Sequence, residues 1–215
     1  MALIQSGVDT TLLTVDPTFK AARVVIKPDE LTGAYQISTA SGALTTIAAQ
    51  TATAGHVFAF RYGGSAICAV KRVSVGFVCT TAFGAAQQMG FGIFAARGYS
   101  ASHSGGTSLT LTGNNNKYRT SLATTGVTNI QISTTTALTA GTQTLDSQPL
   151  GSTYFWVPAA GTSLVQTDLL SYDANDYPLI LVNNEGFVIT NQILMGATGV
   201  GTLIVNVEWF ETASY

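Results

Sequence analysis

The chain has 215 residues, of which 46% are hydrophobic and only 9% are charged, and its formal net charge is -2. Soluble proteins ordinarily carry about 25% charged residues, so we expect neighbouring subunits to cover much of the surface. The charge balance excludes the basic patch that nucleic acid or an anionic membrane would need, and no stretch approaches the roughly 20 apolar residues of a membrane helix.

Residues 1–15 are expected to form an extended N-terminal arm that reaches a neighbouring subunit. This segment lacks the positive start and continuous apolar run of a signal peptide, which predicts a protein made in a cytoplasm and not secreted by the usual route. Asp16 and Pro17 resemble a helix start, and we favour one helical turn leading into a strand. The contact residues expected in the arm are Leu3, Ile4, Leu12 and Leu13.

Alternation of apolar and polar residues predicts a series of strands separated by turn residues. The last two flank the glycine-rich segment 196–201, whose composition predicts a hairpin. The predicted fold is an all-β, single-domain, antiparallel β sandwich of jelly-roll type spanning residues 16–215. The predicted strands are 35–38, 45–48, 56–62, two within 67–97, 127–133, 141–145, 164–172, 179–182, 187–195 and 202–210.

The run from Ile67 to Arg97 carries the strongest pattern. Val73, Val75, Phe77 and Cys79 alternate with other residues, and Met89, Phe91 and Ile93 repeat the pattern, so both sets should face a core. Glycines occupy the opposite face, where they favour either a surface for a second sheet or another chain, or bulges in a curved sheet. These glycines are Gly76, Gly90 and Gly92.

Both cysteines, Cys68 and Cys79, are expected to be small buried groups. Their odd separation on one continuous strand predicts that they point to opposite faces, so a mutual disulfide is disfavoured unless a bulge intervenes.

Residues 100–118 are rich in turn-forming residues and predict a long exposed excursion. Its candidate surface contacts are His103, Asn114, Asn115, Asn116, Lys117, Tyr118 and Arg119.

The turn-rich segment 151–161 contains Tyr154, Phe155 and Trp156. These rings are suited to stacking on a sugar or to sealing a subunit contact, and the second role is at least as well supported because aromatic residues are enriched at interfaces.

The sequence contains no recognisable catalytic constellation. His56 and His103 have no partner at metal-ligand spacing, and no Gly-x-Ser-x-Gly elbow is present. Glu208 and Glu211 should point to opposite faces of a strand, which disfavours a glycosidase pair, and the cluster at 173–176 is read as a solvated turn instead of a calcium site. We therefore expect a protein that is not an enzyme and that holds no metal or cofactor.

Four segments resemble a group of proteins encoded among the particle-structural genes of tailed bacteriophages. They are residues 12–24 (LLTVDPTFKAARV), 111–122 (LTGNNNKYRTSL), 138–151 (LTAGTQTLDSQPLG) and 184–189 (NEGFVI). The resemblance implies a virion structural protein, such as a jelly-roll head decoration (cement) protein, with a tail or fibre component as the alternative.

The leading hypothesis is a homo-oligomer, with a trimer favoured, that binds the major capsid protein or other virion proteins. The second is a host-receptor or carbohydrate-binding module that uses Tyr154, Trp156 and the loop 100–119. A third, a hydrolase, would require acidic or histidine side chains clustered in a cleft.

Overall fold

The computed structural model describes residues 33–157, 163–172 and 177–212, and everything below refers to these residues. The predicted arm, with Leu3, Ile4, Leu12 and Leu13, lies outside them, as do the turn at 173–176 and the predicted strand before Pro28. Every regular element described is a β-strand, and all pairings are antiparallel. No helix long and apolar enough to span a membrane occurs among the described residues.

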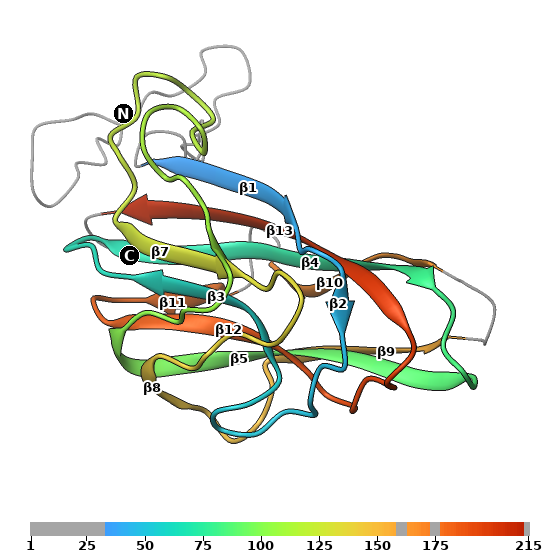
Figure 1. Cartoon of the computed structure of the whole chain (residues 1–215). Coiled ribbons are helices and arrows are strands. Elements are labelled where there is room, and N and C mark those ends of the chain that lie inside the picture. Colours follow the sequence, from blue (N-terminus) through green and yellow to red (C-terminus); the bar gives the residue numbers. More distant parts are fainter. Residues whose placement is uncertain (1–32, 158–162, 173–176, 213–215) are drawn as a thin grey trace, which may run out of the picture.

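Two sheets pack face to face, as Figure 1 shows. The six-stranded sheet contains β1 (Ala34–Ala40), β2 (Leu44–Thr45), β4 (Ile67–Thr81), β10 (Ser163–Ser171), β11 (Leu179–Leu181) and β13 (Val200–Thr212). The seven-stranded sheet contains β3 (His56–Tyr62), β5 (Gln87–Ala101), β6 (Thr107–Ser108), β7 (Val127–Ile132), β8 (Thr142–Leu145), β9 (Gly151–Val157) and β12 (Glu185–Asn191). The predicted β sandwich is confirmed.

The eight longest described strands follow jelly-roll connectivity. In chain order these are β1, β3, β4, β5, β9, β10, β12 and β13. In the six-stranded sheet these strands lie in the order β1-β13-β4-β10, which are the first, eighth, third and sixth of the eight. In the other sheet the order is β3-β12-β5-β9, which are the second, seventh, fourth and fifth. Neighbours in each sheet are therefore distant in sequence, as in the two Greek keys of a jelly roll.

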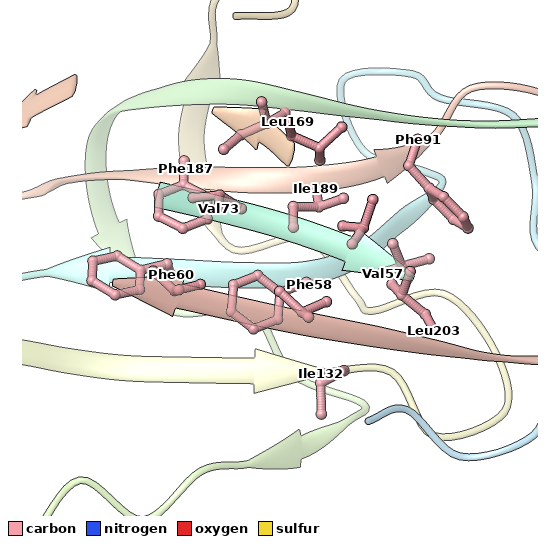
Figure 2. Close-up of a cluster of buried hydrophobic side chains, with 14 of the residues drawn as sticks. Val57, Phe58, Phe60, Val73, Phe91, Ile132, Leu169, Phe187, Ile189 and Leu203 are labelled. Carbon is pink, nitrogen blue, oxygen red and sulfur yellow. The ribbon is translucent and has the colours of Figure 1, made fainter. Parts of the chain in front are cut away.

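The core lies between the two sheets, and Figure 2 shows the side chains that meet there. Phe77 of β4 packs against Phe91 of β5 with ring centroids 5.8 Å apart. Trp209 of β13 meets Phe60 of β3 edge-on at 5.3 Å. Both pairs join opposite sheets, so the aromatic rings supply area burial and a favourable ring geometry at once.

Strand β13 illustrates why the sequence forms this fold. Its buried and half-buried residues alternate over the whole length from 200 to 212. Leu203, Val205 and Val207 are fully buried, whereas Asn206 and Glu208 face outward. The period of two thus gives one strand an apolar face for the core and a polar face for the exterior, as predicted.

The predicted hairpin around residues 196–201 is wrong. Strand β12 pairs with β3 and β5, whereas β13 pairs with β1, β2 and β4, so the segment between them crosses from one sheet to the other. Phe83 occupies the space beside Gly199, where an added Cβ would lie 2.0 Å from its ring. The glycines here permit close packing against aromatic rings and do not form a two-residue turn.

The prediction that Cys68 and Cys79 point to opposite faces is also wrong. A register shift between β4 and β13 skips Lys71, so β4 carries a bulge between the two cysteines. The bulge restores both to the inner face, where Cys68 is buried and Cys79 packs at the edge of the core. Both thiols are free.

Strand β11 differs from its prediction as well. The apolar run 179–182 predicts a strand buried on both faces, but it pairs only with β4 and lies at a sheet edge. Leu181 is buried there, whereas Val182 is 46% exposed.

The predicted strands near 127–133 and 141–145 are confirmed as β7 and β8. Leu138 and Leu145, from the segment that joins β7 to β9, pack with Ala59, Ala96 and Val188 in a second, smaller apolar cluster. This cluster covers part of the seven-stranded sheet on the side away from the main core.

Candidate functional site

The aromatic cluster at 154–156 lies on strand β9 and not on a turn-rich stretch as predicted. Because side chains alternate along a strand, Tyr154 and Trp156 point outward and are 51% and 64% exposed. Phe155 points inward and packs against Phe77 and Phe91 at 5.7 and 6.1 Å. Phe155 is therefore a core residue, which corrects its place among the interface candidates.

Two of the predicted glycines, Gly90 and Gly92, lie on β5 beneath side chains of the same sheet. Gly90 is the cross-strand partner of Tyr154, and a Cβ added to it would come within 2.5 Å of the Tyr154 ring. A Cβ on Gly92 would come within 2.9 Å of Gln192 Nε2. The register of β5 with β9 runs through both glycines without a shift, and the register of β5 with β12 is unshifted at Gly92, so neither glycine marks a bulge.

We call the surface around these glycines the aromatic face. It consists of Gly90, Gly92, Tyr154, Trp156 and Gln192. Gln192 is fixed by hydrogen bonds from its backbone N–H to Gly90 O at 2.8 Å and from Nε2 to Thr190 Oγ1 at 2.6 Å. The glycines let the Tyr154 ring and the Gln192 amide lie flat against the strand. The result is a β-sheet surface with two large rings open to solvent.

The third glycine, Gly76, lies on β4 in the other sheet, where it pairs with Ile204 and is buried. It does not belong to the aromatic face. Its expected role at an interface stays a prediction, as do those of Tyr154, Trp156, Gly90 and Gly92.

His103 is buried, which contradicts its predicted surface position. His56 and His103 are 0% and 2% exposed, and His56 Nδ1 lies 2.8 Å from His103 Nε2. The other nitrogen of His103 bonds to the Tyr99 hydroxyl, and His56 Nε2 lies 3.3 Å from Thr51 O. The two histidines are 47 residues apart, and only the folded chain brings them together.

The histidine chain consists of Thr51, His56, His103 and Tyr99. When both imidazoles are neutral, these partners assign each proton in it. A carbonyl only accepts, so His56 Nε2 donates to Thr51 O and His56 Nδ1 must accept from His103 Nε2. His103 Nδ1 then accepts from the Tyr99 hydroxyl. Both imidazoles are neutral in this arrangement.

Burial lowers the pKa of His56, and burial together with the adjacent His56 lowers the pKa of His103 to about 3. Burial in this dry environment disfavours the charged form of either ring. The hydrogen-bonded histidine chain therefore stabilises the fold when both histidines are neutral.

The predicted surface loop 114–119 packs along the edge of the six-stranded sheet. Gln36 N donates to Asn116 O at 2.9 Å, and Tyr118 N donates to Ala34 O at 3.2 Å, so the loop extends the sheet beside β1. Asn114, Asn115 and Arg119 are exposed and Lys117 is half-buried. Asn116 is 1% exposed and is an exception to the predicted exposure, whereas Tyr118 is 50% exposed.

The loop 114–119 and the aromatic face lie on different sheets. The loop bonds to β1, whereas Tyr154 and Trp156 lie on β9, which pairs with β5. Another part of the predicted loop 100–119 forms β6, which lies at the edge of the seven-stranded sheet opposite to β9. The structure thus places both of these parts of the loop away from Tyr154 and Trp156. Sequence reasoning could not separate them, because strand order is a property of the topology and not of local pattern.

Glu211 is a buried carboxylate that fastens the segment before β7. Its oxygens accept from Gly126 N at 3.0 and 2.9 Å, from Trp209 Nε1 at 3.2 Å and from Thr125 Oγ1. Burial and this nearby charge raise the pKa of Tyr35 to about 12. Glu208 faces the opposite side of β13, as predicted.

No group of three or more His, Cys, Asp or Glu side chains is placed to hold a metal ion in the part of the chain that the structure describes.

Comparisons with known proteins give little further information. No family model and no curated protein matches the chain. Among solved structures, the chain is similar to one in T=1 particles derived from infectious bursal virus, with 11% identity and a TM-score of 0.15. The match covers 93% of this chain and 44% of the viral chain. So low a TM-score supports no conclusion about fold or function.

Proposed function

We propose that this protein is a structural component of a bacteriophage particle, a head decoration protein that forms a homo-oligomer and binds the major capsid protein. It would be made in the host cytoplasm and incorporated into the virion. The resemblance of four segments to tailed-phage particle proteins supports this proposal. The jelly roll is compatible with it, since viral capsid domains use that fold, although fold alone does not establish function.

The aromatic face is the observation that carries the proposal. Tyr154 and Trp156 are more than half exposed on the outer side of the seven-stranded sheet, in a chain with only 9% charged residues. Two further large apolar side chains, Leu150 just before β9 and Leu194 two residues after Gln192, are 41% and 61% exposed. A surface of this kind is typical of a protein contact.

We assign this face to a second copy of the same chain. In a trimer the contact is heterologous, so the aromatic face of each subunit meets a different surface of the next. Covering the exposed part of each ring is worth about 1–2 kcal/mol, because full burial of a large apolar side chain contributes roughly 1.5–3 kcal/mol. Trp156 should therefore behave as an anchor residue of the contact.

The oligomer is tested by measuring the mass of the purified protein in solution. We expect a trimer for the wild type, and dissociation constants about 5- to 30-fold higher for Trp156→Ser and Tyr154→Ser. Tyr177→Ser is the matched control, because Tyr177 is an exposed aromatic residue (86%) outside the aromatic face. A wild-type monomer at high concentration, or equal weakening by all three substitutions, would contradict the proposal.

The proposed position on the phage head is tested separately, by locating this protein on intact virions by electron microscopy. We expect its density on the outer surface of the head, in contact with capsid subunits. Density confined to the tail or fibres would refute the decoration role and favour the host-recognition alternative.

A further inference from the structure

The outer side of the six-stranded sheet carries a polar groove of about 230 Å³. The groove is open to solvent and is on the opposite sheet from the aromatic face. Ile37 is its only aliphatic lining residue. The polar lining residues are Gln36, Ser38, Arg72, Ser74, Gln166, Asn206 and Glu208.

The strand register arranges most of these groups in two rows across the sheet. One row runs from Gln36 through Glu208 to Arg72, and the next runs from Ser38 through Asn206 to Ser74. Neighbours within a row are about 4.8 Å apart and the rows are about 7 Å apart, as the geometry of a sheet requires. Amide, hydroxyl, carboxylate and guanidinium groups therefore alternate over an area comparable with one sugar ring.

The floor of the groove is preorganised. Ser74 is 1% exposed, and its Oγ accepts from Gln166 Nε2 and from Asn206 Nδ2, the latter at 3.4 Å. Arg72 Nε donates to Asp168 Oδ1 at 2.9 Å, and this pairing with the Asp168 carboxylate raises the pKa of Arg72. These bonds hold two amides and one guanidinium in place before any ligand arrives.

Other groups in the groove keep their hydrogen-bonding capacity. Within the described part of the chain, the side chains of Gln36, Ser38 and Glu208 make no hydrogen bond. The Glu208 carboxylate is also close enough to Tyr118 that, together with burial, it raises the pKa of that tyrosine.

The chemistry of the groove selects the class of ligand. Arg72 and Asp168 balance each other, so Glu208 leaves a net charge of about -1, which disfavours phosphate and other anions. An apolar ligand would bury these polar groups without partners. The hydroxyl groups of a ligand both donate and accept hydrogen bonds, so they suit this mixture of polar side chains. The volume of the groove is below the roughly 300–1,000 Å³ of drug-sized pockets, so the groove fits one small ligand unit.

We propose that this groove binds a single saccharide unit, with Glu208, Asn206 and Gln36 hydrogen-bonding its hydroxyl groups. This site is separate from the aromatic face, so one sheet serves subunit contact and the other recognises a glycan. A particle surface protein with this arrangement would bind its ligand while remaining assembled.

The test is an NMR titration of the full-length protein with glucose, galactose, mannose and N-acetylglucosamine, each added separately. We expect at least one sugar to give saturable shifts of the side-chain amide signals of Gln36, Gln166 and Asn206, with a millimolar dissociation constant. Glu208→Gln should weaken that binding about tenfold or more, because it removes the carboxylate and hydrogen bonds to charged groups are stronger than those between neutral groups. Ser38→Ala, at an exposed position, should weaken it severalfold without affecting folding.

Thr202→Ala is the matched control, because Thr202 faces the same side of β13 but lies outside the groove. It should leave the dissociation constant within about twofold of wild type. Absence of binding by all four sugars would overturn the proposal, as would sugar-induced shifts at Tyr154 and Trp156 in place of the groove. Tighter binding of trilysine than of any sugar would also overturn it, because the groove would then be a cation site.

Discussion

Acidification from about pH 7.5 to about pH 5 should destabilise the folded protein through the histidine chain. The folded-state pKa of His103 is about 3 and that of His56 is also lowered, whereas histidine in an unfolded chain titrates near 6.5. The folded state therefore binds fewer protons than the unfolded state in this range. The stability from neutral histidines is fully present above about pH 6.5 and is lost as the pH falls toward 3.

The size of the loss follows from the unfolded state. At pH 5 an unfolded histidine lies about 1.5 units below its pKa, and each unit is worth about 1.36 kcal/mol. His103 alone should thus lower the free energy of unfolding by about 2 kcal/mol, and His56 adds to the loss. The result hardly depends on the folded-state pKa of His103, because that value lies well below 5.

The assay is urea denaturation at both pH values and at one fixed protein concentration, followed by the fluorescence of buried Trp209. The double variant His56→Gln/His103→Gln should be less stable at pH 7.5 but should lose much less stability on acidification. Carboxylates are still mostly ionised at pH 5, so they contribute little to the difference. A wild-type loss below about 0.5 kcal/mol, or an equal loss in the double variant, would refute the proton assignment.

Four further outcomes are expected. Phe77→Ala should lower the free energy of unfolding by about 3–5 kcal/mol in chemical denaturation, because the ring bridges the two sheets. Gly201→Ala should cost about 1–3 kcal/mol in the same assay, since its Cβ would lie 2.0 Å from the Phe77 ring. Glu211→Gln should cost about 1–3 kcal/mol, because the buried donors of Gly126 and Trp209 lose an anionic partner. Deleting residues 1–14 should leave thermal unfolding unchanged but abolish binding to particles, measured by co-sedimentation.

Local pattern was sufficient to predict most strands and the faces of several. Period-two alternation identified the inner residues of β13, β4 and β5, because burial on one side of a sheet imposes that period directly. It failed at Lys71, where one extra residue reverses the facing of everything that follows and leaves no signal of its own in the composition. Cys68 and Cys79 were misassigned for that reason.

Pairing between distant segments was beyond local pattern. Turn-forming residues around His103 suggested exposure, yet the fold buries it against His56. The glycines at 196–201 matched a hairpin composition, but jelly-roll connectivity sends the chain across to the other sheet. The groove was missed in the same way: Asn206 and Glu208 were correctly placed on the outer face of β13, but their neighbours Gln36 and Arg72 come from strands whose adjacency only the topology fixes.

The two outer faces can vary in sequence without disturbing the core, and this follows from the same period of two. Asn206 and Glu208 alternate along β13 with Val205, Val207 and Trp209, so core packing holds the groove in position although these two polar side chains do not belong to the core cluster. Trp156 is likewise held by the inward-facing Phe155 beside it. Substitutions on one outer face should therefore add independently to those on the other, since the two faces share no partner. A Glu208→Gln/Trp156→Ser double variant should lose sugar binding and oligomerisation each to the same extent as the corresponding single variant.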